Sequence, residues 1–148
     1  MSEKQYDLVV LGGGTAGYVA AIRASQLGKK VAIVEKSLLG GTCLHKGCIP
    51  TKALLKSAEV TRTVRQSSEF GIDTNGLHIN FEKMMNRKTD IVNQMHNGVQ
   101  SLMQKNHIDI YNGIGRIMGT SIFSPQSGTI SVESVSYTHL TLPTILLV

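Results

Sequence analysis

The 148-residue sequence has only two cysteines, no long apolar run and no dense block of one charge. Because no 18 consecutive residues are apolar, it predicts no membrane-spanning helix. The polar start, Met1 to Asp7, lacks the apolar core of a signal peptide, which argues for a cytoplasmic protein. Two cysteines are too few for a disulfide scaffold, and a close pair in a cytoplasmic chain indicates catalysis or metal binding.

The charges are not gathered into a patch. Fifteen Lys and Arg against ten Asp and Glu give a net charge of +5, which favours anionic partners. The basic residues are scattered between Lys4 and Arg116, without the dense block that marks a nucleic-acid surface. We therefore expect neither a nucleic-acid nor a membrane partner, and the length predicts one globular domain.

The first 35 residues have the pattern of a βαβ unit. Tyr6 to Leu11 is a short apolar run typical of a buried parallel strand. A glycine run follows, then a predicted helix over Ala16 to Leu27 that ends at Gly28. Val31 to Val34 predicts the second strand. This order within about 30 residues predicts an α/β, Rossmann-like fold.

Gly12, Gly14 and Gly17 form the GxGxxG pattern of dinucleotide sites. The first permits a tight turn, the second lets a pyrophosphate approach the backbone, and the third lets the helix pack closely. The helix N-terminus adds free N–H groups and partial positive charge. Glu35, at the end of the second strand, can accept both ribose hydroxyls, although a solvated charge is the alternative. These features do not choose between NAD and FAD.

A helical pair and a small β-meander are predicted for the remainder. The stretch from Lys52 to Ser68 lacks Pro and Gly, and Asn80 predicts the N-cap of a second long helix. The apolar positions of that helix share one face, which we interpret as core or subunit contact: Phe81, Met84, Ile91, Met95, Val99 and Leu102. Short strands follow, with predicted turns at Gly113, Gly115, Gly119 and Gly128.

The end of the chain looks foreign to the rest. Val135 to Thr144 reads VSYTHLTLPT, the in-frame translation of a transposon adapter used in sequencing libraries. We therefore expect residues 1–134 to be the N-terminal part of a domain, and residues 135–148 to be a non-native tail. A genuine hydrophobic strand is the alternative. If the tail is foreign, the sheet lacks its last strand and the domain is incomplete.

Both cysteines, Cys43 and Cys48, lie in the segment GGTCLHKGCIPTK. Zinc prefers four ligands and only His45 is near, so we predict no metal site. Inert cysteines prefer apolar surroundings, which this polar, glycine-rich segment does not offer. A redox disulfide fits better, because each thiol can resolve the other. A following helix N-terminus, with Lys46 or Lys52 nearby, would lower a thiol pKa.

This cysteine segment resembles the active-site motif of the pyridine nucleotide–disulfide oxidoreductases. Its sequence CLHKGCIPTK, with the following ALLKSAEV, is most similar to that of the bacterial dihydrolipoyl dehydrogenases in that family. Glutathione and mercuric reductases share both cysteines but commonly have Val in place of Ile49. The resemblance runs from about Tyr6 to Ser134. The glycine pattern is common to many families, whereas the cysteine motif is specific.

The resemblance implies an FAD-binding domain, with NAD bound by a later domain absent from this chain. Lys52 would lie near the flavin ring and Gly115 against the adenine. Cys43 would be the interchange thiol and Cys48 the flavin-side thiol. The residues that would contact FAD are Gly12, Gly14, Gly17, Glu35, Lys36, Gly41, Thr42, Cys43, Lys52 and Gly115.

The implied reaction is a two-electron relay from dihydrolipoamide, through the Cys43–Cys48 disulfide and the flavin, to NAD. The implied partners are the lipoyl domain of a 2-oxoacid dehydrogenase or glycine cleavage complex, and a second subunit of a homodimer. In the family that subunit supplies the acid–base histidine, so we expect His45 not to be the base and this fragment alone to be inactive. His78, His96 and His107 are interpreted as surface residues.

Two other functions stay open on the sequence. One is another flavin disulfide reductase of the glutathione or mercuric type. The other is an FAD-binding electron-transfer module that turns over no substrate.

Overall fold

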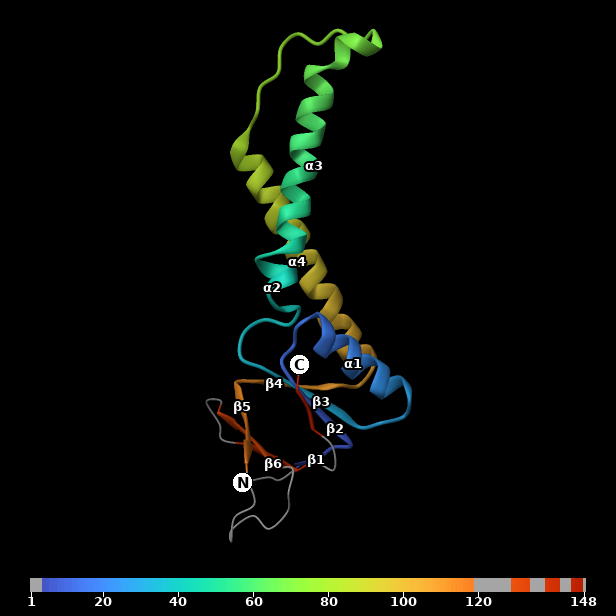
Figure 1. The fold of residues 1–148 in the computed structure, drawn as a ribbon, viewed down its shortest axis with the longest axis vertical. Helices are drawn as coiled ribbons and strands as arrows, with labels where there is room; N and C mark the ends of the chain where they lie inside the picture. The colour runs from blue at the N-terminus through green and yellow to red at the C-terminus, as the bar shows by residue number, and fades with distance from the viewer. Residues whose placement is uncertain (1–3, 119–128, 134–137, 142–144, 148) are drawn as a thin grey trace. The chain divides into compact units, whose positions relative to one another are not determined.

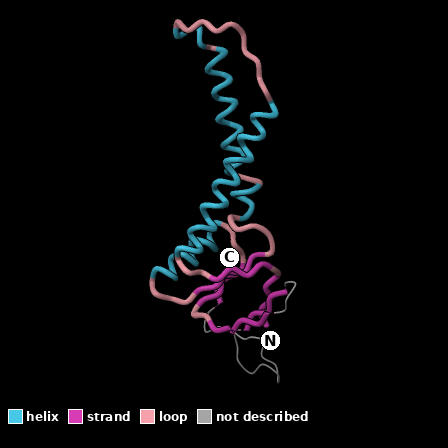
Figure 2. Tube along the Cα trace, turned by 180° about the vertical axis from the view of Figure 1, so that it is seen from behind, coloured by secondary structure: helices cyan, strands magenta, loops and turns pink. Residues whose placement is uncertain are grey.

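The computed structural model describes residues 4–118, 129–133, 138–141 and 145–147, in two units (Figure 1). The first unit is Met1–Gly41 with His96–Val148, and the second is Thr42–Met95. All the described strands belong to the first unit, whereas the second is helical (Figure 2). No helix among the described residues has both the length and the apolar character needed to cross a bilayer.

A parallel sheet is the centre of the first unit. In spatial order its strands are β4 (Asp109–Asn112), β3 (Val31–Glu35), β2 (Leu8–Leu11) and β8 (Ile145–Leu147). Helix α1 (Thr15–Gln26) connects β2 to β3, which are parallel neighbours. The predicted βαβ start of a Rossmann-like α/β fold is therefore confirmed. Gly28 ends α1 with φ +78°, as expected for a C-terminal glycine.

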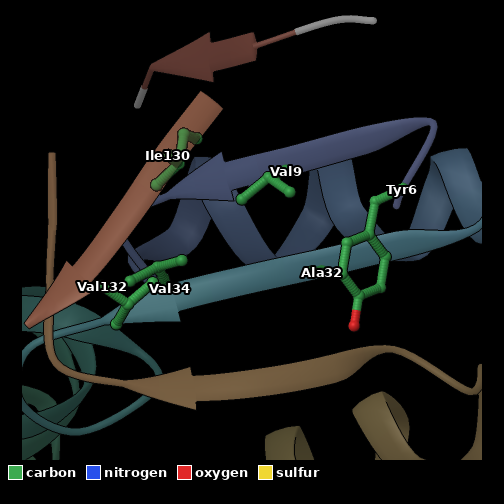
Figure 3. Packing of buried hydrophobic residues seen from close by; sticks show 6 residues of the cluster. All are labelled: Tyr6, Val9, Ala32, Val34, Ile130 and Val132. Carbon is green, nitrogen blue, oxygen red and sulfur yellow. The ribbon is translucent and has the colours of Figure 1, made fainter. Parts of the chain in front are cut away.

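Apolar side chains cover both faces of this sheet, which explains the unbroken apolar runs of β2 and β3. On one face, Val10 lies against α1, because its Cγ1 would be only 3.3 Å from a Cβ placed on Gly17. The opposite face meets β6, and Figure 3 shows side chains from these strands pointing toward one another. The cluster on that face consists of Tyr6, Val9, Ala32, Val34, Ile130 and Val132.

The predicted β-meander forms a second sheet in the first unit. In spatial order its strands are β1 (Lys4–Gln5), β7 (Thr138–Thr141), β6 (Thr129–Glu133) and β5 (Ile114–Met118). Strands β5, β6 and β7 are antiparallel neighbours. Gly113, with φ +154°, turns the chain from β4 into β5, but Gly115 lies inside β5 and its predicted turn is wrong. Gly119 and Gly128 lie outside the described residues.

Two strands fall in the segment that we expect to be foreign, residues 135–148. β7 pairs with β1 and β6, and β8 pairs in parallel with β2. The parallel sheet therefore has a strand at the edge that was expected to be vacant. An open sheet edge pairs with any β-prone segment, whatever its origin. The foreign origin of the tail thus stays a prediction.

The second unit contains most of the predicted helical pair. Helix α2 (Gly41–His45) leads into it, followed by α3 (Cys48–Arg65), the short η1 (Ser67–Phe70) and the first half of α4 (Phe81–Lys105). α3 and α4 run side by side in opposite directions (Figures 1 and 2). The Arg87 guanidinium on α4 donates to the Ala53 carbonyl on α3 at 3.1 Å.

Two boundaries of the helical pair are informative. α3 begins at Cys48, earlier than the predicted Lys52. Pro50 does not prevent this, because the first-turn N–H that it lacks has no partner within the helix. At α4 the predicted N-cap is confirmed, since the Asn80 side-chain oxygen accepts from the Lys83 N–H at 2.9 Å.

The apolar stripe of α4 is core only in part. Val99 is buried, and so is Met103, one position beyond the predicted stripe. Phe81, Met95 and Leu102 are 68%, 46% and 44% exposed, so their prediction as core is wrong. Periodicity identifies a helical face but not what covers it. A subunit contact by this stripe stays a prediction.

Candidate functional site

The glycine turn between β2 and α1 is tight for identifiable reasons. Gly12 has φ +103°, and its N–H donates to the Val34 carbonyl at 2.8 Å, which ties the turn to β3. A Cβ on Gly17 would lie 2.0 Å from the carbonyl oxygen of Gly12, a distance that no side chain tolerates. The predicted roles of these two glycines, a left-handed turn and close helix packing, therefore match the geometry.

Gly14 differs from its neighbours, because a Cβ there would meet nothing within 4 Å. It is the N-cap of α1, and no side chain caps that helix end. The first N–H groups of α1 therefore lack a side-chain acceptor, while open space lies beside the backbone that leads to them. This donor set suits an anionic pyrophosphate, so the turn fits the ADP half of FAD.

Glu35 is fixed at the turn by two backbone donors. Its Oε2 accepts from the Gly13 N–H at 2.6 Å, and its Oε1 accepts from the Ser37 N–H at 2.8 Å. Each carboxylate oxygen has further lone pairs, so a ribose hydroxyl can still bind. Lys36, the next residue, is exposed. The sequence did not reveal that Glu35 also braces the turn.

The chain after β3 folds back onto the glycine turn. The Gly40 N–H donates to the Gly13 carbonyl at 2.7 Å. Gly41 has φ +63°, and a Cβ there would lie 2.8 Å from the Gly14 Cα. A Cβ on Gly13 would lie 2.6 Å from the Leu39 Cδ2. We call Leu39–Gly41 the return segment. Its packing against the glycine turn was not predicted. The doublet Gly40–Gly41 is the sequence signal that could have indicated this close approach.

The position of Gly115 has a packing explanation. A Cβ there would lie 2.5 Å from the Leu11 Cδ2 and 3.2 Å from the Val34 Cγ1. The missing side chain therefore lets β5 lie close to the parallel sheet. Contact between this glycine and an adenine stays a prediction.

Two consecutive helices hold the thiols, the short α2 and the long α3. Cys43 lies in α2 and is half-buried, whereas Cys48 is the exposed first residue of α3. Gly47 between them allows a close turn, because a Cβ there would lie 3.1 Å from the Thr42 carbonyl oxygen. Both cysteines are reduced here, and their side chains are joined by a hydrogen bond. The two thiols therefore lie next to each other.

The pKa of Cys48 is raised from its ordinary value of 9.0. The hydrogen bond with Cys43 is the largest cause, followed by burial. A hydrogen bond from the backbone and the charge of Lys52, one helical turn along, act in the opposite direction. We predicted that the helix N-terminus and a lysine lower a thiol pKa. Both lowering causes act on Cys48, but the hydrogen bond with Cys43 and burial outweigh them.

The predicted site residues thus form two groups, one in each unit. The first unit holds the glycine turn with Glu35, Lys36, Gly41 and Gly115, and the second holds Thr42, both cysteines and Lys52. His78 and His107 are exposed, as predicted. His96 is half-buried and hydrogen-bonded to the Leu39 carbonyl, so its prediction as a surface residue is wrong.

Known proteins are similar to this chain in sequence. The chain is 64% identical over 129 residues to dihydrolipoyl dehydrogenase of Bacillus subtilis (strain 168), covering 87% of this chain and 27% of that protein. It is 44% identical to the mitochondrial dihydrolipoyl dehydrogenase of Schizosaccharomyces pombe, covering 88% and 25%. The chain thus spans about a quarter of these curated relatives, and it is similar to their N-terminal portion.

A solved structure agrees on the fold. The HOCl-induced flavoprotein disulfide reductase of Escherichia coli, solved as a Cu(II) complex, superimposes with a TM-score of 0.74. The two are 24% identical, and the match covers 98% of this chain and 28% of the other. At the family level, residues 6–139 match the pyridine nucleotide-disulphide oxidoreductases. This match covers the glycine turn, Glu35 and both cysteines, and the chain therefore belongs to the pyridine nucleotide-disulphide oxidoreductase family.

Proposed function

We propose that this chain is the FAD-binding, dithiol-bearing part of an enzyme that oxidises dihydrolipoamide with NAD. The observation that carries the proposal is the hydrogen-bonded pair of thiols, Cys43 in α2 and Cys48 at the start of α3. The chain spans 27% of its Bacillus subtilis relative. The remaining sequence would supply the NAD-binding domain and the surface that pairs two subunits, whose partner would bring the acid–base histidine.

The glycine turn would hold the FAD pyrophosphate, since Gly14 leaves the approach to the α1 N–H groups open. Glu35 would accept the ribose hydroxyls with the lone pairs that the backbone leaves free. Cys43 follows Gly41 by two residues, so covalent connectivity alone keeps the thiol near the return segment. Lys36, Thr42, Lys52 and Gly115 are the further proposed contacts. When bound, FAD would carry electrons from the dithiol to NAD.

The substrate step is thiol–disulfide exchange. A dihydrolipoamide thiolate attacks the Cys43 Sγ of the oxidised pair, which forms a mixed disulfide and releases Cys48 as a thiolate. The second substrate thiol, giving its proton to a base, attacks the substrate sulfur in that mixed disulfide. Lipoamide leaves with its own disulfide, and the Cys43 thiolate is released. The substrate thus loses two electrons, which the cysteine pair gains.

The environment of Cys48 suits its role as the leaving group. In the mixed disulfide the Cys43 sulfur carries no charge and is a weak acceptor, so the hydrogen bond from the Cys48 thiol, the largest cause that raises its pKa, is weakened. The backbone hydrogen bond and Lys52, which lower that pKa, remain. A thiol of lower pKa leaves faster in exchange reactions. This change in the pKa of Cys48 supports our assignment of Cys48 as the leaving group and Cys43 as the thiol that is attacked.

The test uses the full-length protein loaded with FAD and mixed anaerobically with dihydrolipoamide. We expect the flavin absorbance to bleach rapidly in the parent, and at least about a thousandfold more slowly in Cys43→Ser, because exchange needs the sulfur. His45→Asn is the matched control, and we expect it to react like the parent. Equal rates in Cys43→Ser and the parent would overturn the assignment of the interchange thiol.

The same preparation separates the two alternative functions. Reduction of the flavin by NADH, with electrons passed to glutathione disulfide or Hg²⁺ but not to lipoamide, would identify another reductase of the family. A flavin that accepts electrons from a dithiol without producing NADH would identify an electron-transfer module. Our proposal predicts NADH formation with dihydrolipoamide as the preferred dithiol.

A further inference from the structure

His96 on α4 binds the chain just ahead of the cysteine segment. Its Nδ1 lies 3.1 Å from the Leu39 carbonyl oxygen. A carbonyl only accepts hydrogen bonds, so the Nδ1 must carry the hydrogen and donate it. His96 shares a helical face with Val99 and Met103, which are 6% and 0% exposed. The donor is therefore held by the part of α4 that is anchored in the first unit.

The carbonyl that His96 holds belongs to the return segment. Leu39 is 4% exposed, and Gly40 donates to the Gly13 carbonyl at 2.7 Å. There is little free space between the return segment and the glycine turn. An added Cβ on Gly13 would collide with Leu39, and one on Gly41 would collide with Gly14. A shift of the return segment would thus move Gly13 and Gly14. Gly14 leads directly to the N–H groups at the start of α1.

We propose that His96 is a positioning residue for FAD binding. By fixing the Leu39 carbonyl, it holds the return segment against the glycine turn and keeps the α1 N–H groups aimed at the pyrophosphate site. His96 itself does not contact the cofactor in this account. The inference rests on the proposed function, because it assumes that the glycine turn binds FAD.

The test compares two replacements of His96 in the full-length protein. Asn places an amide N–H close to the position of the histidine Nδ1, whereas Leu is similar in size and has no donor. We expect His96→Leu to raise the FAD dissociation constant about tenfold, since one partly buried hydrogen bond is lost. We expect His96→Asn to restore most of the affinity. Gln94→Leu, an exposed position on the same helix, should bind like the parent.

The measurements are FAD affinity, followed by flavin fluorescence, and thermal unfolding of the apoprotein. Weak binding by both His96 variants, or unchanged binding by His96→Leu, would overturn the positioning role. If His96→Leu loses the folding of the apoprotein and His96→Asn keeps it, the hydrogen bond serves folding, and the positioning role is overturned. If the parent itself binds no FAD, the proposed function fails, and that result is distinct from either outcome for His96.

Discussion

At the scale of single residues, glycines in one turn are required for different reasons. Gly17 has no room for a side chain, because its Cβ would overlap the Gly12 carbonyl oxygen at 2.0 Å. Gly14 has room for one, since nothing lies within 4 Å of its Cβ position. A requirement for Gly17 therefore comes from folding, whereas a requirement for Gly14 points to a group from outside this chain, such as a bound pyrophosphate.

This contrast predicts opposite behaviour of two alanine variants. Gly17→Ala should lower the free energy of unfolding by about 3 kcal/mol, because backbone must move to relieve the overlap. Gly14→Ala should unfold like the parent, since its φ of −69° suits alanine, yet it should bind FAD at least about tenfold more weakly. Urea unfolding and flavin fluorescence measure the two effects. Full FAD affinity in Gly14→Ala would contradict the assigned pyrophosphate site.

A buried tyrosine predicts how stability depends on pH. The Tyr6 hydroxyl donates to the Asp109 carboxylate and is also hydrogen-bonded to the Tyr111 hydroxyl, 2.6 Å away. Burial, followed by the hydrogen bond to Asp109, raises the pKa of Tyr6 from its ordinary value of 10.0. The folded state then keeps a proton that the unfolded chain loses above that value. Its contribution to stability is complete below pH 10.0 and is lost as the pH rises further.

The urea midpoint should therefore fall as the pH rises from about 10 to 11. In Tyr6→Phe the midpoint should start lower and fall less over the same range, because the titrating hydroxyl is gone. Lysines titrate in both proteins, so the difference between the two curves isolates Tyr6. Parallel curves would show that this tyrosine keeps its ordinary pKa.

At the scale of elements, local sequence signals predicted the helices and strands, but they did not predict the packing between residues far apart in the sequence. The strand, turn and helix from Leu8 to Gln26 follow from residue order, and so does the Asn80 cap. Gly115 was placed in a turn because glycine usually marks one, but here it allows two sheets to approach. The return segment and His96 escaped prediction because their contacts join residues 27 positions apart, Gly40 and Gly13, and 57 positions apart, His96 and Leu39.

The Asn80 cap gives the element-scale prediction. Asn80→Ala should lower the stability of the second unit by about 1 kcal/mol, because the Lys83 N–H loses its acceptor. Asn80→Asp should retain the cap. Asn86→Ala, an exposed position inside α4, should cost nothing measurable. Amide hydrogen exchange in the first turn of α4 reports the change directly, and equal protection in Asn80→Ala and the parent would exclude the cap.

At the scale of the whole molecule, the chain is about a quarter of the length of its relatives. Large apolar side chains of the second unit are exposed in it, including Phe70 at 72% and Phe81 at 68%. We expect further protein surface, from the rest of the enzyme or a second subunit, to cover them. One thirteen-residue segment of the sequence was enough to predict the family. The exposure of these apolar side chains could not be predicted, because their burial by another protein surface leaves no signal in the local sequence.

The central claim is that Cys43 and Cys48 cycle between a disulfide and a dithiol. Differential alkylation of the purified full-length protein, read by mass spectrometry, tests it most directly. The account predicts that neither cysteine is labelled in the oxidised protein and that both are labelled after addition of dihydrolipoamide. Complete labelling of both cysteines before any reductant is added would contradict it.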